Sequence, residues 1–414
     1  MNREIKNIPR SGIVTAIGSK SEIQRYLLAA ALSCDETVID NFFASNDTLN
    51  AAECLSKCFA AVNVNKSKCT VIPFKEKRVC GDFDVGESAT LLRLLLPICA
   101  LRGGEYSFTM GENLAKRPHA PLIGQLEAAG AHIVQEGKRI VLSQKASASV
   151  FVLPADISSQ YISGMLMAMP GSDKNVILRK KGKITSKPYI DLTVDVLKKF
   201  GINVKSFSNS FFISKNEKYI TPQKLTVGGD WSNSSYFFGM GALAGRGITV
   251  CGLDMHSVQG DKRIIDILRT FGAKVAVQGS SVSVTRGELN PVRINADGIP
   301  DLIPIIAVLA CGACGTTVIN GTGRLRYKES DRVTGIYELI LSLGGKVKIG
   351  QDSIAVCGTG RLKGGMVNTY ADHRMIMAAS AASVICSEPV TVSHAESINK
   401  SYPGFFEVLD SLEE

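Results

Sequence analysis

The sequence predicts a mixed α/β fold built from six copies of one unit, because two patterns recur along its 414 residues at a nearly constant interval. The first pattern is a helical run that ends in a small residue and leads into a short strand. Its clear copies begin at Leu55, Leu126, Leu197, Leu268 and Leu341, so the intervals are 71, 71, 71 and 73 residues. A sixth copy is expected near Leu412, in FFEVLDSL. A fixed period of this kind indicates a repeated supersecondary unit.

The second pattern is a polar cluster followed by an apolar helical run. Its six members are residues 19–25, 87–93, 158–160, 230–233, 300–301 and 371–374. We therefore expect two helices and several short strands in each unit, with the polar cluster at the start of the first helix. The start of the second helix is marked by proline or aspartate, at Asp47, Pro118, Pro188, Asp261, Asp331 and Pro403.

These markers have local physical causes. Ser and Asp accept hydrogen bonds from the free amides of a first helical turn, and proline fits where no donor is needed. Ser21 with Gln24 matches a capping box. Glycines that favour helix C-caps precede the expected strands at Gly130, Gly201, Gly272 and Gly344.

Composition limits the class of protein. With 45% hydrophobic residues the chain can bury the cores of two or three domains. Lys and Arg number 47 against 38 Asp and Glu, a net charge of +9 that favours anionic partners. The N-terminus has no apolar signal segment, and the longest apolar stretch, residues 302–314, is shorter than the roughly 20 residues of a membrane span. We expect a cytoplasmic protein.

The cysteines and histidines do not predict a metal site. Eleven cysteines are scattered along the chain, and Cys311 with Cys314 forms one CxxC that no second pair accompanies. We expect free thiols in a reducing compartment for the whole set, and buried thiols for Cys311 and Cys314. The five histidines are dispersed, and no GxGxxG or GxxxxGK[ST] motif indicates a nucleotide.

Basic and hydroxyl residues, together with Gln160 and Glu329, gather where helices should begin. They are Lys20, Ser21, Arg25, Thr90, Arg93, Arg117, Ser158, Ser159, Gln160, Ser186, Lys187, Lys328, Glu329, Arg332, His373, Arg374 and Lys400. A cation at a helix N-terminus costs about 0.3–1 kcal/mol, so repeating the arrangement indicates positive charge gathered for a ligand. Helix starts bind phosphate and carboxylate groups.

At these residues the chain resembles the enolpyruvyl transferase family, and within it the 5-enolpyruvylshikimate-3-phosphate synthases. The matching strings include GSKS, LAKRPHAPL, SSQY, SKPY, GGDWSNSSYF, RYKESDR, YADHRM and NKSYPGFF, between residues 18 and 406. The resemblance implies a two-domain fold with three βαβαββ units per domain. It places residues 13–225 in the first domain and 226–414 in the second, with residues 1–12 packed on the second.

The resemblance also implies the reaction. Phosphoenolpyruvate and 3-phosphoshikimate would give an enolpyruvyl ether and phosphate through a tetrahedral adduct, without metal or organic cofactor. No nucleic-acid or membrane partner is expected, and we expect a monomer.

Residue roles follow by position. The 3-phosphoshikimate set is Lys20, Ser21, Arg25, Ser158, Ser159, Gln160, Ser186, Asp301 and Lys328. The phosphoenolpyruvate set is Lys20, Arg117, Gln160, Arg332, Arg374 and Lys400. The catalytic candidates are Asp301 with Lys20 for the 5-hydroxyl proton and Glu329 for the methylene proton. Ala89, Thr90, Tyr189, His373 and Arg324 are weaker candidates. From the residues alone, Glu329 with Arg332 could equally be an ordinary (i, i+3) ion pair.

Departures from the family pattern carry their own expectations. Glu87-Ser-Ala-Thr90 replaces Asn-Ala-Gly-Thr, and the methyl group of Ala89 predicts reduced sensitivity to glyphosate. The charge of Glu87 has no explanation in the sequence, and Arg324 stands where many members carry Asn. Two alternatives remain: the sister enzyme that acts on UDP-N-acetylglucosamine, whose loop cysteine is missing from residues 112–121, and a basic nucleic-acid binding protein.

Overall fold

The computed structural model describes residues 1–243 and 246–412, and its contacts divide the chain into two bodies. The N-terminal body is Gly18–Val227. The C-terminal body combines Met1–Ile17 with Gly228–Glu414, so the first strands of the chain lie with its second half. Each body is described by itself.

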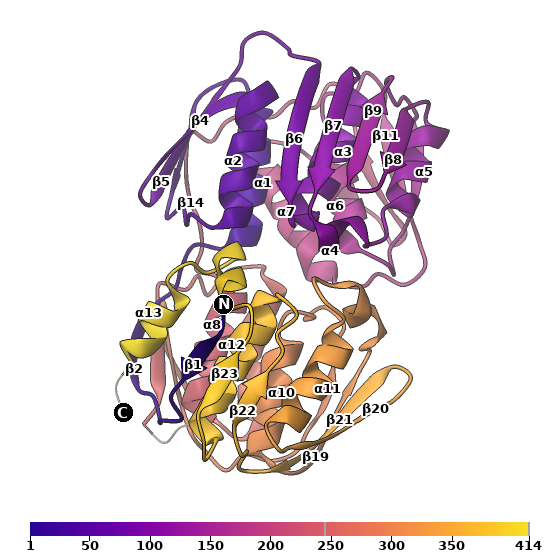
Figure 1. Cartoon of the computed structure of the whole chain (residues 1–414). Helices are drawn as coiled ribbons and strands as arrows, with labels where there is room; N and C mark the ends of the chain where they lie inside the picture. Colours follow the sequence, from indigo (N-terminus) through magenta and orange to yellow (C-terminus); the bar gives the residue numbers. More distant parts are fainter. Residues whose placement is uncertain (244–245, 413–414) are drawn as a thin grey trace. The chain divides into compact units, whose positions relative to one another are not determined.

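The N-terminal body contains three four-stranded sheets and the helices between them (Figure 1). The helices are α1 (Lys20–Ala31), α2 (Asn46–Cys58), α3 (Ala89–Arg102), α4 (Glu112–Ala115), α5 (Ala120–Ala128), α6 (Ser159–Ala168) and α7 (Lys187–Lys199). The strands are β3 (Thr37–Asp40), β4 (Ala60–Asn65), β5 (Lys68–Pro73), β6 (Cys80–Gly86), β7 (Glu105–Met110), β8 (His132–Glu136), β9 (Arg139–Ser143), β10 (Val150–Pro154), β11 (Val176–Lys181), β12 (Lys205–Ser206), β13 (Ser210–Ile213) and β14 (Lys224–Thr226).

The C-terminal body has two four-stranded sheets and one of three strands. Its helices are α8 (Trp231–Leu243), α9 (Ile264–Phe271), α10 (Ile303–Gly312), α11 (Arg332–Ser342), α12 (His373–Ala382) and α13 (Phe405–Asp410), with 3-10 turns η1 (Gly260–Arg263), η2 (Gly323–Tyr327), η3 (Ser383–Ile385) and η4 (Ala395–Lys400). Its strands are β1 (Arg3–Ile5), β2 (Gly12–Thr15), β15 (Ile248–Cys251), β16 (Lys274–Gln278), β17 (Ser281–Thr285), β18 (Arg293–Asn295), β19 (Cys314–Asn320), β20 (Lys346–Ile349), β21 (Ser353–Thr359), β22 (Gly365–Val367) and β23 (Val390–Val392).

One topology repeats through the sheets. In the sheet β6-β7-β9-β8, β6 pairs parallel with β7, and the pairs β7–β9 and β8–β9 are antiparallel. The parallel pair is connected through α3, as parallel neighbours require a crossover. The sheets β10-β11-β13-β12 and β18-β19-β21-β20 have the same order and directions. These are the βαβαββ units expected for the fold.

The other three units borrow a strand from elsewhere in the chain. β2 precedes α1 in sequence but pairs parallel with β15, in the C-terminal body. β14 precedes α8 but pairs parallel with β3, in the N-terminal body. The two bodies therefore exchange first strands. The last unit, which contains β22, α12 and β23, is completed by β1, which pairs antiparallel with β23.

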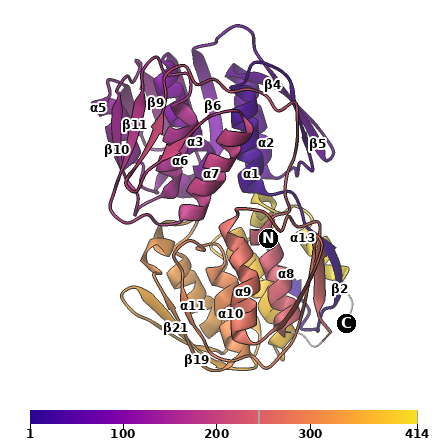
Figure 2. The ribbon, with the colours of Figure 1, turned by 180° about the vertical axis from the view of Figure 1, so that it is seen from behind.

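The most buried helices of each body pack against one another, the sheets lie farther out, and helices such as α7 and α9 keep an exposed face (Figures 1 and 2). In the N-terminal body α1, α3 and α6 are buried on almost every side, which explains why their sequences are apolar beyond the first turn. At Gly164 of α6, an added Cβ would lie 1.9 Å from the carbonyl oxygen of Arg93, so α3 and α6 can pack this closely only with glycine there. α8, α10 and α12 are the corresponding buried helices of the C-terminal body.

The glycines expected at helix C-termini are confirmed. Gly130, Gly201, Gly272 and Gly344 all have positive φ after a helix.

The buried-thiol expectation holds for Cys311 and is wrong for Cys314, which is exposed at the start of β19; all eleven cysteines are free. Across residues 1–243 and 246–412, no helix is long and apolar enough to span a bilayer.

Candidate active site

The polar clusters of the N-terminal body stand at the starts of its buried helices. Ser88 caps α3 by accepting from the amide of Leu91, and Ser158 caps α6 by accepting from the amide of Gln160. The capping box predicted at Ser21 and Gln24 is wrong, because α1 begins at Lys20 with Ser19 as its N-cap. Gln24 is buried and instead donates to Ser88 Oγ at 2.8 Å, which connects α1 with α3.

A hydrogen-bond network joins α3 and α6 at these starts. Arg93 donates to Gln160 Oε1 at 2.8 Å and to Ser158 Oγ at 3.4 Å. The side-chain nitrogen of Gln160, Nε2, donates to Thr90 Oγ1 at 2.8 Å. Arg93 therefore fixes which way the Gln160 amide faces. Arg93 had no predicted role, although a single cation within an apolar helix indicates a specific polar partner.

Arg25 is a buried cation whose hydrogen-bond acceptors are neutral groups. Its guanidinium donates to Thr193 Oγ1 at 2.8 Å, to the Ser21 carbonyl at 2.9 Å and to the Tyr189 carbonyl at 3.3 Å. Burial lowers the pKa of Arg25 to about 10, and the nearby Tyr189 and Glu22 oppose this desolvation only in part. Such a site gains free energy from an anion. Tyr189 lies in the first turn of α7, whose N-cap is the buried, left-handed Ser186.

Other predicted residues of this body lie on the same helix starts or the connecting segments. Lys20 opens α1 and forms an ion pair with Asp47 at 2.9 Å. Ala89 and Ser159 are the first residues of α3 and α6, and both are buried. Arg117 lies between α4 and α5. The start of that second helix, predicted at Pro118, is found at Ala120, with His119 as its N-cap.

His119 is a structural residue of the same segment. It is buried, its Nε2 lies 2.9 Å from the Leu114 carbonyl, and burial lowers its pKa to about 4. It is therefore neutral at physiological pH. The preceding Pro118 carbonyl accepts from Arg93 at 2.9 Å and from the Tyr161 hydroxyl at 2.5 Å.

In the C-terminal body, Arg332 forms ion pairs with three carboxylates. It is the first residue of α11, its side chain is 1% exposed, and it donates to Asp301 at 2.8 Å, Glu329 at 2.9 Å and Asp372 at 2.8 Å. Burial would lower its pKa, but the adjacent carboxylates raise it well above its usual value. The (i, i+3) ion pair considered for Glu329 is thus present, as one part of a larger cluster.

Asp301 is the shared acceptor of this cluster. Lys328 lies 3.4 Å and Arg374 3.5 Å from its carboxylate, in addition to Arg332. Burial opposes its ionisation, yet Lys328, Arg374 and Arg332 together hold its pKa well below the usual range. Burial lowers the pKa of Lys328 to about 8. The helix start predicted at Asp301 is found two residues later, at Ile303, so Asp301 lies in the preceding turn.

Asp372 links the two arginines, a role the sequence analysis did not assign. Its carboxylate accepts from the backbone amide of Arg374, as the N-cap of α12, and from the side chain of Arg332. Its position before His373 and Arg374 at a helix start was the available signal. Asn233 of α8 also contacts this region, since it accepts from Arg374 at 3.5 Å and donates to Ser401 at 3.3 Å.

The remaining candidates of the C-terminal body surround these elements. His373 is buried, with Nδ1 3.8 Å from Asp372. Lys400 is buried at the end of η4, next to Ser401. Arg324 is half-buried in η2, ahead of Lys328. Among the described residues no group of three His, Cys, Asp or Glu side chains could hold a metal ion.

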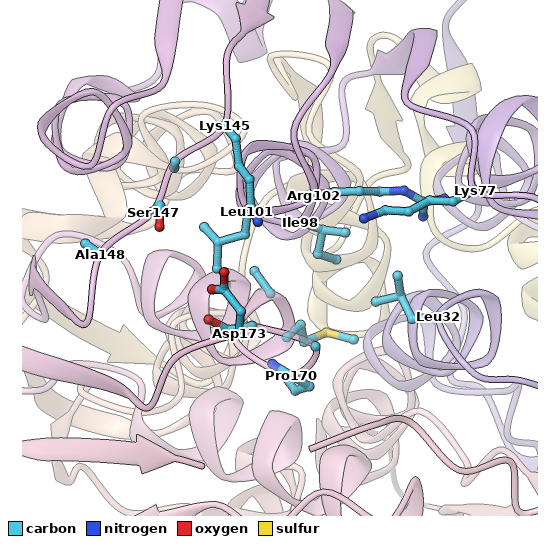
Figure 3. Close-up of a pocket in the computed structure, with 15 residues that line it drawn as sticks. Leu32, Lys77, Ile98, Leu101, Arg102, Lys145, Ser147, Ala148, Pro170 and Asp173 are labelled. Carbon is cyan, nitrogen blue, oxygen red and sulfur yellow. The ribbon is translucent and has the colours of Figure 1, made fainter. Parts of the chain in front are cut away.

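A cavity of about 180 Å³ in the N-terminal body lies away from these clusters (Figure 3). Its lining includes Leu32, Ile98 and Met167, at the C-terminal ends of α1, α3 and α6. The predicted residues occupy the opposite ends of the same helices. The cavity therefore contains none of them, although Lys77, Arg102 and Lys145 surround it (Figure 3).

Comparison with known proteins agrees with the motifs. A family model described as EPSP synthase (3-phosphoshikimate 1-carboxyvinyltransferase) matches residues 5–409. Curated relatives named 3-phosphoshikimate 1-carboxyvinyltransferase include one from Methanocorpusculum labreanum, 33% identical over 410 residues (97% of this chain and 96% of the relative), and one from Clostridium perfringens strain SM101, 34% identical over 412 residues (again 97% and 96%).

Solved structures share the fold. An EPSP synthase from Acinetobacter baumannii superimposes with a TM-score of 0.82 at 22% identity, covering 99% of this chain and 98% of that one. The enolpyruvyl transferase NikO from Streptomyces tendae gives 0.78 at 17% identity, covering 99% and 97%. The two-domain enolpyruvyl-transferase-like fold expected from the motifs is confirmed.

Proposed function

Because the chain belongs to the EPSP synthase family, we propose that it transfers the enolpyruvyl group of phosphoenolpyruvate to the 5-hydroxyl of 3-phosphoshikimate and releases phosphate. The observation that carries the mechanism is the Arg332 guanidinium, which holds both proton-transfer candidates, Asp301 and Glu329, at 2.8 and 2.9 Å. The reaction removes one proton and adds another, so it needs two carboxyl groups in a fixed relation.

The N-terminal body would bind the phosphate of 3-phosphoshikimate. Arg25 supplies a buried cation without a carboxylate among its hydrogen-bond acceptors, and a phosphate dianion would offset its desolvation. Hydroxyl groups at the starts of α1, α6 and α7 would complete the phosphate site, namely Ser21, Ser158, Ser159 and Ser186. Gln160, oriented by Arg93, would touch both substrates, while Asp301 and Lys328 would hold the ring hydroxyls.

Phosphoenolpyruvate would be bound by lysine and arginine side chains. The set is Lys20, Arg117, Arg332, Arg374 and Lys400. Arginine suits this role because its planar group binds a carboxylate or phosphate through two parallel hydrogen bonds. The ion pairs of Lys20 with Asp47 and of Arg332 with Asp372 hold these cations in place before the substrate arrives.

In the addition step, the 5-hydroxyl oxygen bonds to C2 of phosphoenolpyruvate as its proton passes to Asp301. C3 gains a proton from Glu329, which would carry it because the neighbouring anionic substrate favours the protonated carboxyl group, and becomes a methyl group, which gives the tetrahedral adduct. In the elimination step, Glu329 takes a proton back from that methyl group, the C2–C3 double bond forms again, and the bond from C2 to the phosphate oxygen breaks. The proton on Asp301 leaves with the phosphate.

Substrate binding would also change the pKa of the base, Asp301. Without substrate, the three neighbouring cations hold the pKa of Asp301 well below its usual range, which makes it a weak base. The negative charges of phosphoenolpyruvate would offset Arg332 and Arg374 and so raise the pKa of Asp301. The base would then gain strength only when its co-substrate is present.

The direct test measures phosphate release from phosphoenolpyruvate by the purified chain. We expect release that depends on added 3-phosphoshikimate and saturates with both substrates. UDP-N-acetylglucosamine in place of 3-phosphoshikimate is the matched control and should give none. Release with the nucleotide sugar alone, or none with either acceptor, would overturn the proposal.

A cytoplasmic location and a monomeric state belong to the same proposal. The location is supported by eleven free cysteines, which a reducing compartment maintains. Gel filtration with light scattering would test the monomer, and a mass near twice the 44.3 kDa of the chain would contradict it.

A further inference from the structure

Glu87, the unexplained acidic residue of the sequence, lies between β6 and α3 and contacts the backbone of α4. Its carboxylate accepts hydrogen bonds from the amide of Asn113 at 3.1 Å and from the amide of Leu114 at 2.8 Å. α4 is a single turn, and its N-cap, Gly111, has no side chain to accept these bonds. Glu87 therefore supplies the capping carboxylate from another part of the chain, where a negative charge is stabilised.

The contact with Glu87 requires glycine at position 111. A Cβ built at that position would lie 2.1 Å from Glu87 Oε1, so any other residue would displace the carboxylate. The amide of Gly111 also donates to the Gly86 carbonyl at 2.8 Å, one residue before Glu87. Two independent contacts thus hold the start of α4 against the end of β6.

The turn that Glu87 caps leads to Arg117. The amide of Leu114 binds Glu87, and the carbonyl oxygen of the same residue accepts from the amide of Arg117 at 3.0 Å. That carbonyl oxygen also lies 2.9 Å from Nε2 of His119. At the other end of the segment, the Pro118 carbonyl is held by Arg93 at 2.9 Å. The backbone around Arg117 is therefore fixed on one side by Glu87 and on the other by Arg93.

We propose that Glu87 is a positioning residue that sets Arg117 for phosphoenolpyruvate, through the α4 turn and without touching a substrate. The inference rests on the proposed function, which assigns Arg117 to phosphoenolpyruvate. It also accounts for a carboxylate so near an anion site: its charge is directed at the α4 amides, which partly neutralise it.

The test compares Glu87→Ala and Glu87→Gln with Glu112→Gln. Glu112 lies on the same turn, is exposed and pairs with Lys138, so its variant makes the same charge change without the capping contact. We expect Glu87→Ala to raise the KM for phosphoenolpyruvate about tenfold, the scale of one charged hydrogen bond, with the KM for 3-phosphoshikimate changed less than about twofold. Glu87→Gln keeps one acceptor oxygen and should recover part of this loss, while Glu112→Gln should match the wild type.

Amide hydrogen exchange provides a readout besides activity. Asn113 and Leu114 should exchange faster in Glu87→Ala than in Glu112→Gln, whether or not the enzyme turns over. A lower Tm with unchanged KM for phosphoenolpyruvate would reduce Glu87 to a structural role and overturn the inference. Equal changes in both KM values would also overturn it. An inactive wild type with the expected exchange pattern would instead contradict the proposed function.

Discussion

The two bodies place buried arginines at helix starts but surround them differently. In the N-terminal body Arg25 and Arg93 donate to hydroxyl, amide and carbonyl oxygens, which carry no formal charge. In the C-terminal body Arg332 donates to three carboxylates. A buried cation among neutral acceptors gains most from an incoming anion, whereas one among carboxylates is already compensated and fixes their positions. This difference is what the proposed roles require, namely a phosphate site around Arg25 and a site of proton transfer around Arg332.

The largest expected effect tests the carboxylate-rich cluster. Asp301→Asn keeps the shape of the side chain but cannot accept the 5-hydroxyl proton, so kcat should fall about 10²- to 10⁴-fold. Steady-state phosphate release measures it. Asp266→Asn, on the exposed face of α9 in the same body, is the control and should leave kcat unchanged. An active Asp301→Asn enzyme would remove proton transfer from this cluster.

Stability measurements compare the two environments directly. Arg332→Gln leaves three carboxylates without their shared cation and should cost about 3–5 kcal/mol of unfolding free energy. Arg25→Gln removes a cation that lacks a carboxylate acceptor, so its cost should stay below about 1–2 kcal/mol while the KM for 3-phosphoshikimate rises. Urea unfolding of both variants provides the comparison. Equal losses of stability would show that the two environments do not differ as described.

The pH dependence of Lys328 sharpens the comparison further. Its pKa is lowered from 10.5 to about 8, so the folded protein loses this proton above pH 8 while the unfolded chain keeps it to about 10.5. Between these values the group's contribution to stability should increase with pH, because the unfolded state binds more protons. Catalysis should show the opposite trend, since kcat/KM falls as the Lys328 charge is lost.

A pH series of unfolding and of kcat/KM tests this prediction. Lys328→Arg, which keeps its charge throughout the range, is the matched variant and should shift the alkaline limb of kcat/KM to higher pH. An unmoved limb would assign that titration to another group.

The smallest expected effect is steric and belongs to the N-terminal body. Ala89, the first residue of α3, is buried beside Thr90, and its methyl group should reduce the space available to glyphosate. Ala89→Gly should therefore increase inhibition about tenfold, which is the lower end of the effect of one methylene in a pocket. Inhibition curves at fixed phosphoenolpyruvate measure it, and equal potency against both enzymes would refute it.

Several contacts could not be predicted, because they join residues far apart in the chain. Gln24 was expected to cap its own helix, yet it bonds to Ser88, 64 residues away. Glu87 had no interpretation until α4 was found against it, and Arg93 had no role until α6 supplied Gln160. Helix caps can be predicted from the sequence because they depend on neighbouring residues. The partner of a buried polar side chain depends on which helices pack together.

By itself the sequence determined the repeat and the family, because the spacing and the motifs are present in the sequence itself. It also determined most helix starts, because capping depends on residues within one turn of each other. Only the tertiary structure decided that β2 and β14 are exchanged between the bodies, since a short strand pairs with whichever sheet edge packing presents. It also decided that Asp372 links Arg332 to the start of α12. Burial makes such pairing necessary, because an ion removed from water must find its partner within the folded protein.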